Sequence, residues 1–297
     1  MGRLRRAGWL VALAAVPCFA AEPKLAVVKK TEVFQGGIVE IEAAADGLTA
    51  IEGRFGKEKI GLYPTGAGKF GAVLGIDLEA EPGPARIWLK AVGRSGSERE
   101  ATLSFKVKAR AFATESFSVA QDHEPVGPEA MERIRAEQEQ FARVFAASIP
   151  HRLWEGTFIR PVAGEVRSPF GLRRIVNGIA RAPHAGADLR APQGTQVLAS
   201  NHGRVVLVGD FFFSGKSMVL DHGAGVFTMY FHLSEFLAQQ GAAVRKGDPI
   251  ALSGMTGRVT GPHLHWGARI YNARIDPFEL IEKIGAERGE AASANRE

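Results

Sequence analysis

Hydrophobic and polar residues alternate along three segments in the N-terminal third of the chain. The alternating apolar positions are Val39, Ile41 and Ala43, then Ile87, Leu89 and Ala91, then Leu103, Phe105 and Val107. Successive side chains of a strand point to opposite faces, so this period of two predicts strands with one buried face. Gly/Pro turns such as Pro82-Gly83-Pro84 separate the segments. Residues 22–110 are therefore predicted to form an independently folded, non-catalytic β-sandwich, because this segment contains no histidine and no cluster of polar residues suited to chemistry.

A single helix is predicted inside a linker over residues 111–155. Between residues 128 and 147 the pattern changes to a helical period, with an apolar side formed by Met131, Ile134, Phe141 and Phe145. Pro128 suits a first helical turn and Pro150 stops the pattern. The apolar stripe is too short for several heptads, so we expect a connecting helix that packs on a core and not a coiled coil.

Short strands and Gly-rich turns return over residues 156–281. The predicted strands include Gln196–Val208, Ser217–Asp221, Val226–Phe231 and His263–Tyr271. Residues 282–297 form a predicted polar tail that frays. The predicted fold class is therefore mainly β, with an N-terminal β-sandwich, a connecting helix and a C-terminal antiparallel β-sheet domain.

The first 20 residues have the pattern of a secretory signal peptide. Three arginines precede an apolar run from Trp9 to Ala15, and small residues follow around Ala20. That run is too short to span a bilayer. Attachment of a lipid to Cys18 is a lesser alternative, because Pro17 makes a poor lipidation signal. We therefore expect an exported protein with no membrane span after removal of residues 1–20.

Removal of this leader changes both the charge and the metal chemistry. The leader contains the only cysteine, so the mature chain has neither a disulfide nor a thiolate metal site. It also carries three of the 37 basic residues and no acidic one, which leaves 34 basic against 32 acidic residues, or +2. A net charge this small gives no electrostatic support for nucleic-acid binding. Without a cysteine, the ligands of any metal must be histidine and carboxylate side chains.

Histidines are concentrated in the C-terminal part, where residues 156–281 hold six of the eight. The first motif is His184-Ala-Gly-Ala-Asp188. Pro183 and Gly186 disfavour a helix, so the four-residue spacing indicates a loop that enters a strand, unlike the helical His-Glu-x-x-His of other zinc proteases. Both side chains can still converge on one ion.

The second motif is Gly261-Pro-His263-Leu-His265-Trp-Gly267. In an extended backbone, residues two apart lie on the same face, roughly 7 Å apart. One of these histidines can bind a metal while the other faces the substrate. Two histidines and one aspartate leave a fourth position of a tetrahedral zinc site for water, which is typical of catalytic zinc.

These motifs occur together in a known family. In order along the chain they are Ser168-Pro-Phe-Gly171-Leu-Arg173, His184-x-Gly186-x-Asp188, Tyr230-Phe-His232-Leu, and Gly257 through His265. Over about residues 160–280 the sequence resembles the lysostaphin-like (LytM-type) zinc peptidases of bacterial cell walls. The upstream segment, with Gln35-Gly36-Gly37 and Gly75-Ile76-Asp77, resembles the immunoglobulin-like domain that precedes this peptidase in some Gram-negative members.

The resemblance implies one Zn²⁺ per chain, bound by His184, Asp188 and His265. It implies that His232 and His263 flank the zinc-bound water as catalytic histidines. The implied function is a periplasmic metalloendopeptidase that hydrolyses cross-links or stem peptides of peptidoglycan. A zinc D,D-carboxypeptidase on the same substrate is the first alternative, and a non-catalytic activator of a cell-wall amidase is the second. The sequence leaves the oligomeric state open.

Other binding functions fit the sequence less well. Residues 210–217 end in Gly-Lys-Ser, but Asp210 occupies the first glycine position of a phosphate loop and a strand is predicted to follow, which excludes nucleotide binding. A cupin needs a Glu shortly after its His-x-His, and residues 266–270 contain none. The run Phe211-Phe212-Phe213 is predicted to put at least one ring in a core. The remaining histidines are expected to have ordinary structural roles; they are His123, His151, His202 and His222.

Overall fold

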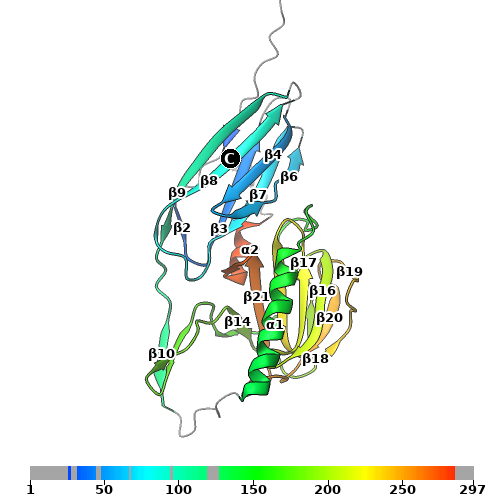
Figure 1. The fold of residues 1–297 in the computed structure, drawn as a ribbon. Coiled ribbons are helices and arrows are strands. Elements are labelled where there is room, and N and C mark those ends of the chain that lie inside the picture. The colour runs from blue at the N-terminus through cyan, green and yellow to red at the C-terminus, as the bar shows by residue number, and fades with distance from the viewer. Residues whose placement is uncertain are drawn as a thin grey trace, which may run out of the picture.

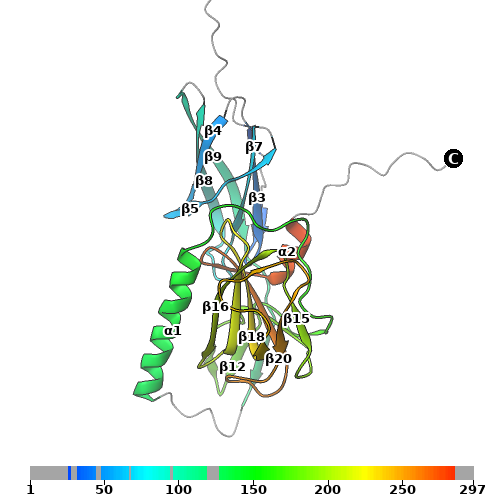
Figure 2. The same cartoon turned by 90° about the vertical axis from the view of Figure 1, so that its right-hand side faces the viewer.

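The computed structural model describes residues 26–27, 32–44, 48–66, 68–93, 96–118 and 127–284. Two β-rich halves lie end to end, and a long helix runs along the sheet of the second half (Figures 1 and 2). The blue and cyan half is N-terminal, and the half coloured green to orange is C-terminal. The predicted signal peptide lies outside the described residues.

The N-terminal half contains two sheets, with strand orders β1-β3-β7-β6 and β2-β9-β8-β4-β5. The strands are β1 (Ala26–Val27), β2 (Glu32–Phe34), β3 (Ile38–Ala44), β4 (Leu48–Phe55), β5 (Glu58–Ile60), β6 (Tyr63–Gly66), β7 (Lys69–Gly75), β8 (Gly83–Gly93) and β9 (Glu98–Lys108). All nine alternating apolar positions predicted from the sequence are at most 5% exposed, and both sheets contribute to one apolar core. The sandwich is thus confirmed, while its immunoglobulin-like class stays a prediction.

The C-terminal half is built on a ten-stranded sheet whose main path is β11-β14-β21-β18-β17-β16-β19. Its strands are β11 (Val166–Ser168), β14 (Gly186–Leu189), β15 (Gln196–Leu198), β16 (Gly203–Phe211), β17 (Gly215–Asp221), β18 (Val226–Phe236), β19 (Ala243–Val244), β20 (Pro249–Ser253), β21 (Leu264–Ile270) and β22 (Ala273–Ile275). A small sheet beside it joins β10 (Thr114–Phe117), β12 (Arg173–Val176) and β13 (Ile179–Ala180). All pairings within the large sheet are antiparallel, as predicted.

One predicted strand, Gln196–Val208, is wrong as a single element. The structure divides it into β15 and β16, because the buried Asn201 ends the first strand and accepts a hydrogen bond from the backbone N–H of His202 at 2.8 Å. Asn201 also donates to the carbonyls of Glu155 and Thr157 at 3.2 Å each. These bonds satisfy a buried amide side chain that a continuous strand would leave unpaired.

The connecting helix α1 spans Pro128–Ala146, in agreement with the predicted range of 128–147. Ile134 and Phe145 are buried, and Phe141 is half-buried. Met131 was expected on the packed side, but it is 54% exposed, because the first buried residue of the helix is Ile134, about one turn later. The aromatic rings that contact the sheet, Phe141 and Phe145, lie further along the helix. Among the described residues, no helix is long and apolar enough to cross a membrane.

The two halves share an apolar core. Ile38, Tyr63 and Val73 of the sandwich pack in one cluster with residues of the C-terminal half, namely Trp154, Phe158, Ala224, Val226, Ala268, Ile270, Ile275, Leu280 and Ile284. Helix α2 (Pro277–Lys283) follows β22, and Ile284 is 2% exposed. The packed part of the chain thus extends three residues beyond the predicted limit at residue 281. The halves are therefore joined by buried surface as well as by the connecting segment.

An ion pair between Asp77 and Arg274 also connects the two halves. Asp77 accepts hydrogen bonds from Nη2, Nε and the backbone N–H of Arg274, at 2.6, 3.0 and 2.9 Å, and from the backbone N–H of Glu79 at 2.9 Å. Burial acts to raise the pKa of Asp77, but these hydrogen bonds outweigh burial and lower that pKa below its ordinary value. The charged form of Asp77 therefore stabilises the folded state.

Asp77→Asn is expected to lower the free energy of unfolding by about 2 kcal/mol at pH 7. Because the folded-state pKa is lowered, this contribution is fully present above the unfolded pKa of about 3.9 and is lost as the pH falls through the folded pKa. Urea unfolding at pH 7 and below pH 4 measures the difference, which should shrink in acid. Glu98→Gln is the control, since its exposed pair with Lys90 contributes little. Equal stability of Asp77→Asn and the wild type at pH 7 would contradict the prediction.

Candidate metal centre

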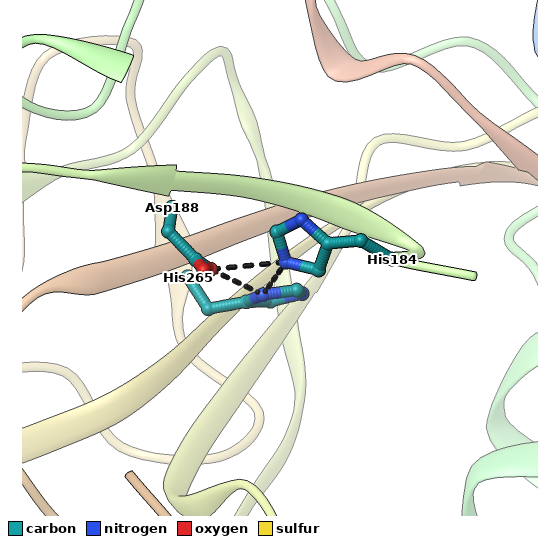
Figure 3. A group of neighbouring side chains, drawn as sticks. All are labelled: His184, Asp188 and His265. Atoms are coloured by element: carbon teal, nitrogen blue, oxygen red, sulfur yellow. Dashed lines mark hydrogen bonds and ion pairs between the residues drawn. The ribbon is translucent and has the colours of Figure 1, made fainter. Parts of the chain in front are cut away.

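Two neighbouring strands bring the predicted metal ligands together. His184 lies in the loop that enters β14, Asp188 lies within β14, and His265 lies in β21. Asp188 and His265 are directly paired across the two strands. Figure 3 shows the three side chains converging on a common point. The structure thus confirms the prediction that the His184–Asp188 motif is a loop that enters a strand.

The three ligand atoms are close to one another. Nε2 of His184, Oδ1 of Asp188 and Nδ1 of His265 form a triangle with 3.0 Å between every pair of atoms. This is the group of histidine, cysteine and acidic side chains that satisfies metal-site geometry within the described residues. Zinc bonds to nitrogen and oxygen are about 2.0–2.2 Å long, so donor atoms at this separation fit a single ion. Two imidazoles and one carboxylate also match the chemistry that zinc prefers.

The hydrogen bonds of His184 set the protonation of its ring. Its Nδ1 lies 3.0 Å from the carbonyl oxygen of Pro169 and 3.2 Å from Oγ of Ser168. A carbonyl oxygen only accepts, so Nδ1 carries the proton and donates it there. Nε2 then presents its lone pair toward Asp188 and His265, as a metal ligand requires.

The charges of the group also suit a cation. Burial acts to raise the pKa of Asp188, but the hydrogen bonds and charges of His184 and His265 outweigh burial and hold that pKa far below its ordinary value. Burial is the main cause of a lowered pKa at His265. The carboxylate is therefore anionic and the His265 imidazole is neutral at neutral pH, which is the state in which both bind metal.

A glycine is required beneath the site. A Cβ atom added to Gly186 would lie 2.6 Å from Nε2 of His265 and 2.7 Å from the carbonyl oxygen of Trp266. The ring of His265 lies directly over this position. Gly186 thus allows the paired strands to carry the imidazole close to the backbone, a role beyond the helix-breaking one inferred from the sequence.

Two further histidines flank the group. The His232 and His263 ring centroids are 4.9 Å apart, and the His232 and His265 centroids are 6.0 Å apart. Nε2 of His263 lies 3.7 Å from Oδ1 of Asp188. The structure therefore brings together all five side chains predicted for the site.

The flanking histidines share one hydrogen-bonding arrangement. Nδ1 of His232 lies 3.0 Å from the carbonyl oxygen of Thr256, and Nδ1 of His263 lies 2.9 Å from that of Gly261. Each Nδ1 must donate to its carbonyl, which leaves both Nε2 atoms free for proton transfer. Burial, followed by the neighbouring His265, lowers the pKa of His232 to about 4, so its imidazole is neutral at neutral pH.

His232 also has an unusual backbone. Its φ of 63° places it in the left-handed region, which is uncommon for residues other than glycine. Its N–H donates to the carbonyl of Ser214 at 2.9 Å, and its side chain is held by Thr256. Backbone strain of this kind persists where surrounding contacts fix it, and such residues concentrate at functional sites.

Sequence reasoning did not assign a role to Phe231. Its ring stacks on that of His265, with centroids 5.3 Å apart and planes 4° from parallel. Phe231 is directly paired with His265 across β18 and β21. Phe231 lies within the Tyr230-Phe231-His232 motif, but a motif does not show which strand pairs with its own strand, so the contact with His265 could not be predicted.

The other aromatic and histidine predictions have clear outcomes. Phe211 is buried, which confirms that at least one ring of its run is in a core, while Phe213 is 44% exposed. His222 is a buried structural residue whose ring nitrogens lie 2.8 Å from the carbonyl of His202 and 2.7 Å from Oγ1 of Thr228. His123 lies outside the described residues.

Comparisons with known proteins match one segment of the chain to a family. The model of Peptidase family M23 matches residues 182–277. Peptidoglycan DD-endopeptidase ShyA of Vibrio cholerae is 44% identical over 102 residues, which are 34% of this chain and 24% of that protein. DD-carboxypeptidase/endopeptidase Mpg of Neisseria meningitidis is 43% identical over 115 residues, 39% of this chain and 26% of that protein. The match therefore spans about a quarter of the length of these relatives.

A solved structure matches much more of the chain. The putative peptidase M23 from Pseudomonas aeruginosa has 28% sequence identity and a TM-score of 0.65, and the similarity covers 86% of this chain and 96% of that one. The matched family segment, residues 182–277, contains the converging ligands and both flanking histidines. Residues 182–277 therefore form a domain that matches Peptidase family M23.

Proposed function

We propose that the chain is an exported zinc metallopeptidase that hydrolyses peptide bonds of bacterial peptidoglycan. One observation carries the proposal: the donor atoms of His184, Asp188 and His265 lie 3.0 Å apart, with His232 and His263 beside them. Relatives named as peptidoglycan DD-endopeptidases support the substrate class. Their cell-wall substrate also supports export to the periplasm, in agreement with the predicted leader.

The proposed roles follow from the free atoms of each side chain. His184, Asp188 and His265 would hold one zinc ion, which polarises the scissile carbonyl and lowers the pKa of a water molecule when bound. Nε2 of either His232 or His263 accepts the proton of the attacking water, and the other donates to the developing oxyanion. Both rings are preorganised for these roles because backbone carbonyls fix their Nδ1 atoms.

A carboxypeptidase activity is the second candidate. It is favoured by the relatives named DD-carboxypeptidase/endopeptidase, which are 43% identical over 115 residues. Both activities use the same ligands and differ in whether the substrate ends just beyond the scissile bond. A non-catalytic amidase activator is disfavoured, because such a protein needs none of the five converging side chains.

The purified chain without residues 1–20 is expected to contain one zinc ion and to cleave isolated peptidoglycan. Mass spectrometry of the digest distinguishes the candidates, since an endopeptidase converts cross-linked dimers to monomers and a carboxypeptidase only removes a terminal D-amino acid. Chelation should abolish cleavage, and added zinc should restore it. Full activity in a sample shown to be metal-free would overturn the proposed mechanism.

A further inference from the structure

We propose that the connecting segment between the two halves positions both histidine ligands, through Phe112 on the side of His184 and Phe141 on the side of His265. This inference rests on the metal site of the proposed function. Phe112 precedes β10 and Phe141 lies in α1, so the two contacts come from different parts of the segment. Strand β10 and helix α1 lie apart from each other in Figure 1.

On the first side, Phe112 covers the turn that holds the backbone of His184. Its ring lies edge-on to that of Phe170, with centroids 6.1 Å apart. A Cβ atom on Gly171 would lie 2.0 Å from the Phe112 ring, so the aromatic ring rests directly on this glycine. The N–H of Gly171 donates to the carbonyl of His184 at 2.8 Å, and the N–H of His184 donates to the carbonyl of Leu172 at 3.0 Å. Phe112 therefore packs on the peptide groups that fix the ligand backbone.

Strand β10 supports the same ligand through its side chain. β10 pairs in parallel with β12, and Glu115 of β10 is the register partner of Arg174. Arg174 Nη2 donates to Oγ of Ser168 at 2.9 Å, and that hydroxyl lies 3.2 Å from Nδ1 of His184. The strand that follows Phe112 thus aligns the arginine that orients a direct hydrogen-bonding partner of the imidazole.

On the second side, an aromatic stack connects α1 to His265. Phe231 lies nearly parallel to the His265 ring. Phe141 contacts Phe231 at a centroid distance of 5.9 Å with planes at 74°, and it also contacts Phe211 at 4.8 Å. Rotation of the His265 imidazole would require Phe231 to move, and Phe141 restricts that movement.

Polar bonds fix the helix that carries Phe141. Glu137 accepts a hydrogen bond from the backbone N–H of Phe212 at 2.9 Å, and Arg133 donates to the carbonyl of Asp210 at 3.1 Å. Glu137 and Arg133 are themselves paired at 2.7 Å. These bonds fix helix α1 against the end of β16 and the turn that follows it, and they thereby fix the position of Phe141 beside Phe231.

Such contacts affect metal binding because they orient the ligands before the metal arrives. Mutation of the residues that orient metal ligands typically lowers metal affinity or activity by 10–100-fold. Without Phe112 or Phe141, His184 or His265 must lose more conformational freedom when zinc binds. The expected signature is a weaker zinc affinity in a chain that still folds, since neither residue supplies a ligand atom.

The test measures the zinc dissociation constant of Phe112→Ala and Phe141→Ala at 25 °C by competition with a chromophoric chelator. Both are expected to bind zinc about 10-fold more weakly than the wild type. Phe117→Ala, in the strand that follows Phe112, and Met131→Ala, in the helix of Phe141, are the controls, because their side chains are 45% and 54% exposed. Both controls should retain the wild-type dissociation constant. Circular dichroism and thermal melting verify that each measured chain is folded.

The outcomes separate this inference from the proposed function. If the wild type binds no zinc, the metal site itself is wrong and the inference falls with it. If the wild type binds zinc and both folded phenylalanine variants bind it within twofold of the wild type, only the positioning role is overturned. Should an alanine variant not fold, Phe112→Leu and Phe141→Leu keep apolar volume without the flat ring, and a smaller loss of affinity in the same direction is expected.

Discussion

Replacing His184, Asp188 or His265 by alanine is expected to abolish zinc binding and peptidoglycan cleavage together. Each substitution removes one of three donor atoms that lie 3.0 Å apart, and two remaining ligands do not hold a catalytic zinc firmly. Metal analysis of the purified variants, made beside a cleavage assay, measures both effects. We expect less than one tenth of the wild-type zinc content and no detectable products.

A histidine outside the group provides the control for this prediction. His202 is partly exposed and its backbone lies in the turn between β15 and β16, so His202→Ala should retain zinc and activity. The assignment within the His-x-His strand has its own check. Release of zinc by His263→Ala together with retention by His265→Ala would reverse the roles of these two residues and require a different mechanism.

Local patterns predicted much of the fold because they report burial directly. In β3, β8 and β9, alternate apolar residues such as Val39, Leu89 and Phe105 face the shared core of the sandwich, and the sequence shows this as an alternation of apolar and polar positions. The same holds for α1, whose start at Pro128 follows from the constraints of proline at a first helical turn. Such signals depend only on a residue and its near neighbours.

Features that depend on distant partners could not be predicted in the same way. The break between β15 and β16 depends on Asn201, whose amide finds acceptors 44 and 46 residues away. Met131 is exposed although it lies on the apolar side of α1, and the sequence of the helix does not show at which turn its buried contacts begin. The junction of the halves is similar, because Asp77 and Arg274 are 197 residues apart.

The site shows the same division between ligands and their supports. The residue types and spacing of two motifs predicted His184, Asp188, His263 and His265 as site residues. The resemblance to a known family added His232 and the role of each residue, and the structure brings all five together. Phe231, Thr256 and Phe141 were not assigned supporting roles, because aromatic rings and backbone carbonyls are common everywhere in a sequence. Their roles arise only when β18 pairs with β21 and α1 packs on the sheet.

Substituting His232 or His263 is expected to separate catalysis from metal binding. Neither side chain belongs to the triangle of donor atoms, so zinc content should stay near the wild-type level. Loss of proton transfer or of oxyanion stabilisation should lower kcat by roughly 10²–10⁴-fold. For His232 the informative variant is His232→Asn, since asparagine tolerates the left-handed backbone that this position requires (φ 63°), whereas alanine adds backbone strain to the loss of the imidazole.

The measurement compares kcat, zinc content and melting temperature for His232→Asn, His263→Ala and the control His202→Ala. A true catalytic role predicts low kcat with normal zinc content and a melting temperature close to the wild type. A merely structural role predicts the opposite, with a lower melting temperature and near-normal kcat for the folded fraction. Because Nδ1 of each ring is already occupied by a backbone carbonyl, only Nε2 remains to act on the substrate. Retention of full kcat by either variant would therefore remove that residue from the proton-transfer step.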